Sequence, residues 1–193
     1  MKVTEDQIRE WINEYKREGY YDAASKRCWD NMYIHAPKSK YYINGVPSCA
    51  VWKKLVKEAF LESQSFADFD ELYRRLVKLK GEKNVKGIGE LLIYDTATCL
   101  GARPTKIYIH AGVIDGLAAL RGVEKGEIRD HSPIELEMFF EEFPVFKDSE
   151  LQAIHIEDFL CIYHHDLNNN SDRGRRNRNY VRNNYRTCAC CCK

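Results

Sequence analysis

Two glycines between helical patterns are the residues of this sequence best suited to bind a ligand. Gly87-Ile88-Gly89 separates an apolar helical stripe over 66–79 from a second helical pattern that begins at Glu90. Glycine accepts backbone angles that other residues resist and lets another backbone come close. The first amides of a helix lack intrahelical partners and, with the helix dipole, attract an anion. We expect an anion there, with the isoleucine turned inward and Lys83 and Lys86 beside the anion.

This hairpin resembles the helix–hairpin–helix of the DNA glycosylase superfamily, which grips a phosphate beside a damaged base. The similarity covers about 66–120 and includes Thr96-Ala97 and Ile107-Tyr108-Ile109-His110. It implies a helical fold that binds a nucleic-acid backbone, with DNA favoured over RNA. The family's chemistry does not follow. Tyr108 stands where many members have the catalytic Asp, and no lysine occupies the lyase position near Glu90-Leu91. Thr96 also follows Gly89 by seven residues, one helical turn later than in the family.

A carboxylate and a histidine downstream of the hairpin are weak candidates for general acid–base chemistry. Asp95 is a charged residue in an otherwise apolar helical segment, and His110 and Asp115 follow it. A carboxylate near an imidazole can move protons. The same groups can equally make buried hydrogen bonds that only hold the fold together, and this reading is favoured.

The last apolar helical segment, 150–165, carries residues that could share a metal. Cys161 and His165 are four residues apart, with Asp158 and His155 one or two turns earlier. Such spacing can form a metal-binding face. The neighbouring large apolar residues indicate packing instead, so neither a metal nor another cofactor is predicted.

The C-terminal segment is strongly basic and nearly without apolar residues. Residues 172–193 carry seven Lys and Arg against one Asp, about +6, whereas 1–171 carries about −5. We interpret 168–193 as a disordered tail in which Arg175, Arg176 and Arg178 contact nucleic acid, with tyrosines stacking on bases. Two alternatives remain open: a basic stretch before lipid-modified cysteines that anchors the chain to a membrane, and an extension without function.

The remaining patterns predict short helices with little strand. The sequence predicts a capping box of Thr4 and Gln7 before one helix, and Ser48 is a candidate cap for another. Apolar periodicity predicts further helices at 22–32, 66–79, 90–100, 112–120, 134–143 and 150–165, with Pro133 at a helix start and an extended piece at 106–110. The expected fold is mainly α: one orthogonal multi-helix domain over 1–167 that contains the helix–hairpin–helix.

Three functions remain open at this level. The first is a nucleic-acid-binding module without catalysis, and the second is a glycosylase-like or nuclease enzyme. The third is a protein-interaction domain, which the acidic net charge of 1–171 favours. No run approaches the roughly 20 apolar residues of a membrane span, and the first residues show no apolar signal core. We therefore expect a cytoplasmic or nuclear protein.

Overall fold

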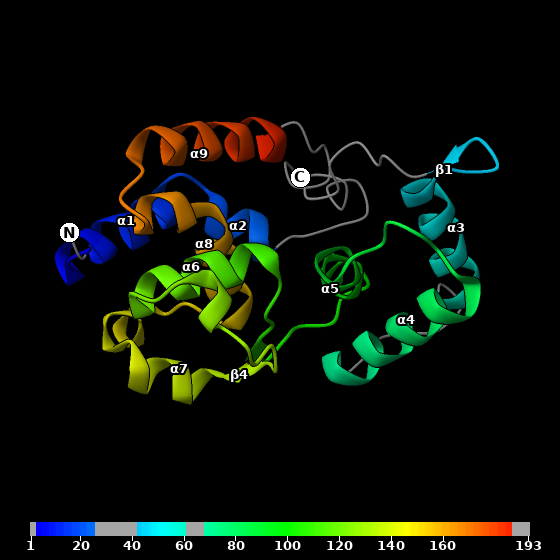
Figure 1. The fold of residues 1–193 in the computed structure, drawn as a ribbon, viewed down its shortest axis with the longest axis horizontal. Coiled ribbons are helices and arrows are strands. Elements are labelled where there is room, and N and C mark those ends of the chain that lie inside the picture. Colours follow the sequence, from blue (N-terminus) through cyan, green and yellow to red (C-terminus); the bar gives the residue numbers. More distant parts are fainter. Residues whose placement is uncertain (1–2, 26–41, 61–67, 187–193) are drawn as a thin grey trace. The chain divides into compact units, whose positions relative to one another are not determined.

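The structure divides the chain into two compact units. A computed structural model describes residues 3–25, 42–60 and 68–186, and this part of the chain is mainly helical, as predicted (Figure 1). One unit joins 1–26 to 104–193, and the other spans 27–103. We call them the terminal unit and the middle unit. The predicted single domain over 1–167 differs from this division, because segments from both ends of the chain build the terminal unit.

In its described residues, 42–60 and 68–103, the middle unit contains a β-hairpin followed by three helices. Its elements are β1 (Tyr42–Ile43), β2 (Val46–Pro47), α3 (Ser48–Phe60), α4 (Phe69–Lys83) and α5 (Glu90–Cys99). Asn44 and Gly45 both have positive φ, 51° and 78°, as the tight turn between two antiparallel strands requires.

Polar and aromatic contacts hold these helices together. Asp68 caps α4 by accepting hydrogen bonds from the amides of Asp70 and Glu71, so this helix begins at Phe69 rather than at the predicted residue 66. The Trp52 indole donates to the Thr96 hydroxyl at 2.9 Å and joins α3 to α5. The rings of Phe69 and Tyr94 pack between α4 and α5, with their centroids 5.4 Å apart.

The terminal unit is built around a buried helix. Its elements are α1 (Glu5–Arg17), α2 (Tyr20–Ser25), β3 (Lys106–Ile107), α6 (Ala111–Arg121), the 3₁₀ turn η1 (Lys125–Glu127), β4 (Ile134–Glu135), α7 (Leu136–Glu142), the 3₁₀ turn η2 (Pro144–Ser149), α8 (Ala153–Leu167) and α9 (Ser171–Arg186). The predicted Thr4–Gln7 capping box is present. Helix α8 contacts α1, α2, α6 and α9.

Helix α7 begins two residues later than the predicted segment 134–143. Ile134 and Glu135 pair antiparallel with Ile107 and Lys106, so the residues after Pro133 are extended. A pairing between segments this far apart is not visible in a local pattern. The extended piece at 106–110 is confirmed for its first two residues, which form β3.

The disorder predicted for 168–193 is wrong for most of that segment, because Ser171–Arg186 form the helix α9. Gly174 and Val181 are buried, and Asn177 donates to the Ile162 carbonyl oxygen at 2.8 Å. A contact with α8 therefore orders a segment whose composition alone favours a solvated chain. Residues 187–193, with the cysteine cluster, lie outside the described residues.

None of the helices in the described ranges combines the length and apolar composition needed to cross a membrane.

Candidate nucleic-acid interface

The 84–89 segment joins α4 to α5 and anchors itself by two apolar side chains. Asn84 ends α4 in the left-handed conformation with φ of 48°, and Gly87 has φ of 82°. Val85 lies between these two residues and Ile88 directly follows Gly87, and each of them is 2% exposed. The expectation that Ile88 turns inward is confirmed. The two buried side chains fix the path of the backbone into α5.

Helix α5 begins at a glycine with an open surface beside it. Gly89 is the N-cap, and among the described residues no side chain caps the helix at this position. The Gly89 carbonyl oxygen accepts the first intrahelical bond, from the Ile93 amide at 3.1 Å. A Cβ at Gly89 would meet no described atom within 4 Å. The first-turn amides therefore have no side-chain cap, and the Gly89 α-carbon beside them is not covered by a described atom.

Gly89 does not need glycine's freedom of φ. Its backbone is extended, with φ of −90° and ψ of 176°, which any residue can adopt. The expected need for unusual backbone angles applies to Gly87 only. The Gly89 position can consequently be changed without strain, which makes it suitable for a binding test.

The charges around this helix start are mixed, with a basic surplus. Lys83 and Lys86 are exposed, and Glu90 in the first turn is exposed as well. Burial raises the pKa of the neighbouring Tyr73 to about 12, and the Glu90 carboxylate adds to this shift.

The middle unit carries 13 Lys and Arg against 9 Asp and Glu, a net charge of +4. Because the whole chain carries +1, the terminal unit carries −3. The acidic balance noted in the sequence therefore belongs to the terminal unit.

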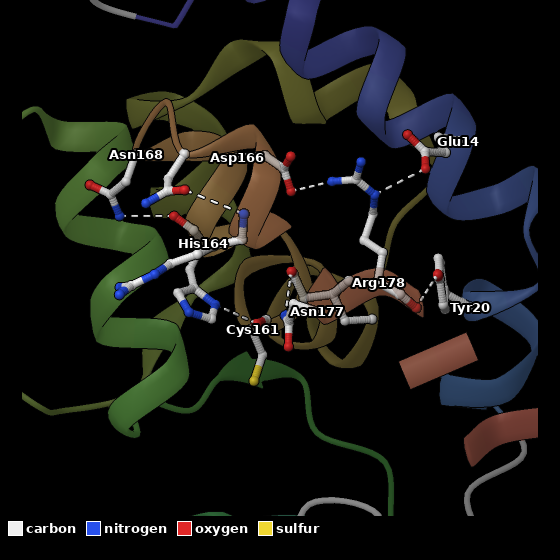
Figure 2. Close-up of polar contacts among 11 residues, drawn as sticks. Glu14, Tyr20, Cys161, His164, Asp166, Asn168, Asn177 and Arg178 are labelled. Carbon is white, nitrogen blue, oxygen red and sulfur yellow. Dashed lines mark hydrogen bonds and ion pairs between the residues drawn. The ribbon is translucent and has the colours of Figure 1, made fainter. Parts of the chain in front are cut away.

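Helix α9 holds the predicted tail arginines in different surroundings. Figure 2 shows the Arg178 guanidinium between Asp166 and Glu14: Nη1 pairs with Asp166, and Nε lies 3.2 Å from a Glu14 oxygen. Arg175 and Arg176 are exposed, and Arg175 lies 3.2 Å from Asp172. Arg178 thus stabilises the fold and could meet a phosphate only by breaking two ion pairs.

The three weak catalytic candidates lie in different surroundings. Asp95 is a buried residue of the middle unit, and His110 and Asp115 belong to the terminal unit. His110 is 2% exposed, and its Nε2 lies 2.6 Å from Glu157, a buried partner that sequence reasoning missed because it is 47 residues away. Asp115 instead pairs with Lys125 at 2.7 Å. The His110–Glu157 contact joins α6 to α8 and has too little exposure to meet a substrate.

A serine–histidine contact in the terminal unit has the wrong protonation for a nucleophile. Ser25 Oγ lies 2.7 Å from His155 Nε2. The Gln152 amide donates to His155 Nδ1 at 3.1 Å, so in the neutral ring Nε2 carries the proton. The histidine then donates to the serine hydroxyl and cannot accept its proton, as a catalytic base must.

The described ranges contain a cavity but no cluster of metal-binding side chains. No group of three or more His, Cys, Asp or Glu side chains there could hold a metal ion. A cavity of about 270 Å³ lies where α6 and α8 end, lined by residues such as Val3, Ala118, Val123, Leu167 and Asn168. None of the candidate acid–base residues lines it.

Comparisons with known protein families, with curated proteins and with solved structures find no match for this chain.

Proposed function

We propose that the middle unit binds the phosphate backbone of a nucleic acid at the N-terminus of α5, in the manner of a helix–hairpin–helix and without catalysis. The observation that carries this proposal is the helix start at Gly89, where no described side chain caps the helix and a Cβ would meet no described atom within 4 Å. A phosphate oxygen accepts hydrogen bonds from unpaired amides of this kind.

Electrostatics supports an anion at this position. The N-terminus of a helix carries the equivalent of roughly half a positive charge. The exposed ammonium groups of Lys83 and Lys86 and the net charge of +4 of the unit add to it, against one nearby carboxylate on Glu90. Amides and lysines read the backbone rather than the bases, so the proposed binding is independent of sequence. DNA is the first ligand to test, since the resemblance is to proteins that bind DNA.

The test introduces an internal anion at the proposed phosphate position. In Gly89→Asp, the carboxylate would cap α5 and occupy the amides that the phosphate needs. The full chain is titrated into fluorescein-labelled duplex DNA and followed by fluorescence anisotropy. We expect the affinity to fall about tenfold or more, as the loss of a charge-assisted hydrogen bond predicts. The free energy of unfolding should stay equal or rise by a few tenths of a kcal/mol.

Two matched variants separate this effect from charge and shape. Gly126→Asp makes the same charge change at an exposed glycine of η1, where a Cβ also meets no described atom within 4 Å. Gly89→Ala keeps the amides available. Both should bind DNA within about twofold of the wild-type chain, well under the tenfold of one hydrogen bond. Equal losses in the two aspartate variants would contradict the proposal, because charge alone would then explain them.

A further inference from the structure

Helix α9 divides its arginines between an inner and an outer face. On the inner face, Arg178 pairs with Glu14 and Asp166, and Arg182 pairs with Glu18. The Tyr20 hydroxyl also donates to the Arg178 carbonyl oxygen at 2.9 Å, which fixes the helix against α2 (Figure 2). The inner arginines are therefore neutralised and hold α9 in place.

Arg173, Arg176 and Tyr180 lie on the outer face. They are spaced three and four residues apart, so they are neighbours along one side of the helix. Both arginines are exposed, and the tyrosine is 56% exposed. Within the described part of the chain, no carboxylate lies at ion-pair distance from either Arg173 or Arg176. The charge of Arg173 also contributes to a lowered pKa of His165, whose largest cause is burial.

We propose that Arg173, Arg176 and Tyr180 form a second nucleic-acid contact that prefers single strands. The two guanidinium groups would pair with successive phosphates of one strand, and the phenol ring would stack on an unpaired base. Arginine pairs with phosphate through two parallel hydrogen bonds, and aromatic rings in a basic surface stack on bases of any sequence. This inference rests on the proposed function only in taking a nucleic acid as the partner.

The composition of α9 favours a nucleic acid over a membrane surface. A helix that lies in a membrane interface needs a broad apolar face to insert. Among the α9 residues whose burial is described, 171–182, Val181 is buried inside the terminal unit and Tyr180 is the exposed large apolar side chain. The described outer face therefore offers two guanidinium groups and the Tyr180 ring, which fit phosphates and a base.

The experiment measures the salt dependence of binding for the full chain. Labelled 20-nucleotide single strands and 20-base-pair duplexes are titrated at 50 and 200 mM salt. Each phosphate contact adds about 0.7 to the slope of log affinity against log salt for a single strand. The double variant Arg173→Gln/Arg176→Gln should therefore reduce the magnitude of this slope by about 1.4. The fourfold rise in salt would then weaken its binding about sevenfold less than that of the wild-type chain.

Two further variants complete the design. Arg129→Gln/Lys147→Gln removes two exposed charges elsewhere in the terminal unit and should leave the slope within about 0.3 of the wild-type value, under half of one phosphate contact. Tyr180→Ala should weaken single-strand binding about fivefold or more while changing duplex binding less than about twofold. Circular dichroism checks that each variant keeps its helices.

Each outcome decides between the two proposals. Equal slopes for the two double variants, or equal loss on both DNA forms in Tyr180→Ala, would overturn the α9 contact. The α9 contact would also be overturned if the α9 variants lost binding to vesicles of anionic lipid while their DNA binding stayed unchanged. If Gly89→Asp alone abolishes DNA binding, the α5 site stands and the α9 contact fails. If only the α9 variants reduce DNA binding, the α9 contact stands and the α5 site fails. If the wild-type chain binds no DNA, both proposals are overturned.

Discussion

Two glycines allow α6 to lie unusually close to α8. A Cβ at Gly116 would lie 2.6 Å from the Leu160 carbonyl oxygen, and one at Gly112 would lie 2.5 Å from the Cys161 sulfur. Real Cβ atoms do not approach other atoms so closely, so an added methyl must displace its neighbour. The backbone of α8 gives way less easily than a side chain, so the two positions should differ in tolerance.

We expect Gly116→Ala to lower the free energy of unfolding by about 1–3 kcal/mol, the usual cost of overpacking. Gly112→Ala should cost less, because the Cys161 side chain can rotate away. Gly81→Ala is the control: Gly81 lies in α4, and a Cβ there meets no described atom within 4 Å, so this change should stabilise the protein by about 0.5–1 kcal/mol. Urea unfolding of the three variants measures the order, and an equal response at positions 112 and 81 would show that the α6–α8 approach is not close.

Tyr73 should make the middle unit sensitive to alkali. Its pKa is raised from 10.0 to about 12, first by burial and then by Glu90. Above pH 10 the unfolded phenol loses its proton while the folded one keeps it. The contribution of the protonated Tyr73 phenol to the free energy of unfolding is therefore complete below pH 10 and is lost as the pH rises through about 12. In urea unfolding between pH 9 and 12, Tyr73→Phe should show a weaker decline than the wild-type chain. Parallel curves would mean that the phenol is not protected.

At the scale of elements, α9 depends on long-range ion pairs that a local pattern does not reveal. Its sequence is rich in Arg and Asn, and Val181 is the buried apolar residue among the α9 residues whose burial is described, 171–182. The composition therefore resembles that of a solvated tail. Three carboxylates neutralise the inner arginines of α9. Glu14 lies on α1, Glu18 directly follows α1, and Asp166 lies on α8. Only the folded terminal unit brings these carboxylates to α9.

Arg178→Ala should therefore destabilise the terminal unit by about 3 kcal/mol, because it leaves the 3%-exposed Asp166 side chain without its cation. Arg175→Ala on the same helix removes one exposed pair with Asp172 and should cost about 0.5 kcal/mol or less. Urea unfolding followed by circular dichroism makes the comparison. If the two variants unfold alike, α9 is not held by its inner arginines.

Other elements were predictable from the sequence because their signals are local. The Thr4–Gln7 capping box and the apolar periodicity of α4 and α6 each lie within one short stretch of the sequence. The inward turn of Ile88 followed from its place between two glycines. The late start of α7 and the Glu157 partner of His110 could not be predicted, since both depend on contacts between segments distant in the chain.

At the scale of the whole molecule, charge is distributed unevenly between the two units. The middle unit carries +4 and the terminal unit −3, although the chain as a whole is nearly neutral. An overall charge near zero therefore conceals a basic unit with the α5 helix start and an acidic unit whose α9 presents arginines on its outer face. A polyanion would be attracted to these two places and repelled elsewhere on the terminal unit.

The backbone amides at the start of α5 can be followed directly during DNA binding. The full chain, labelled with ¹⁵N, is titrated with a short duplex, and the amide signals are recorded by NMR. We predict that the signals of residues 89–92 are among those that shift most, and that they titrate with the affinity measured by anisotropy. If the duplex binds to saturation while these four amides stay unmoved, the phosphate does not sit at the N-terminus of α5 and the account is wrong.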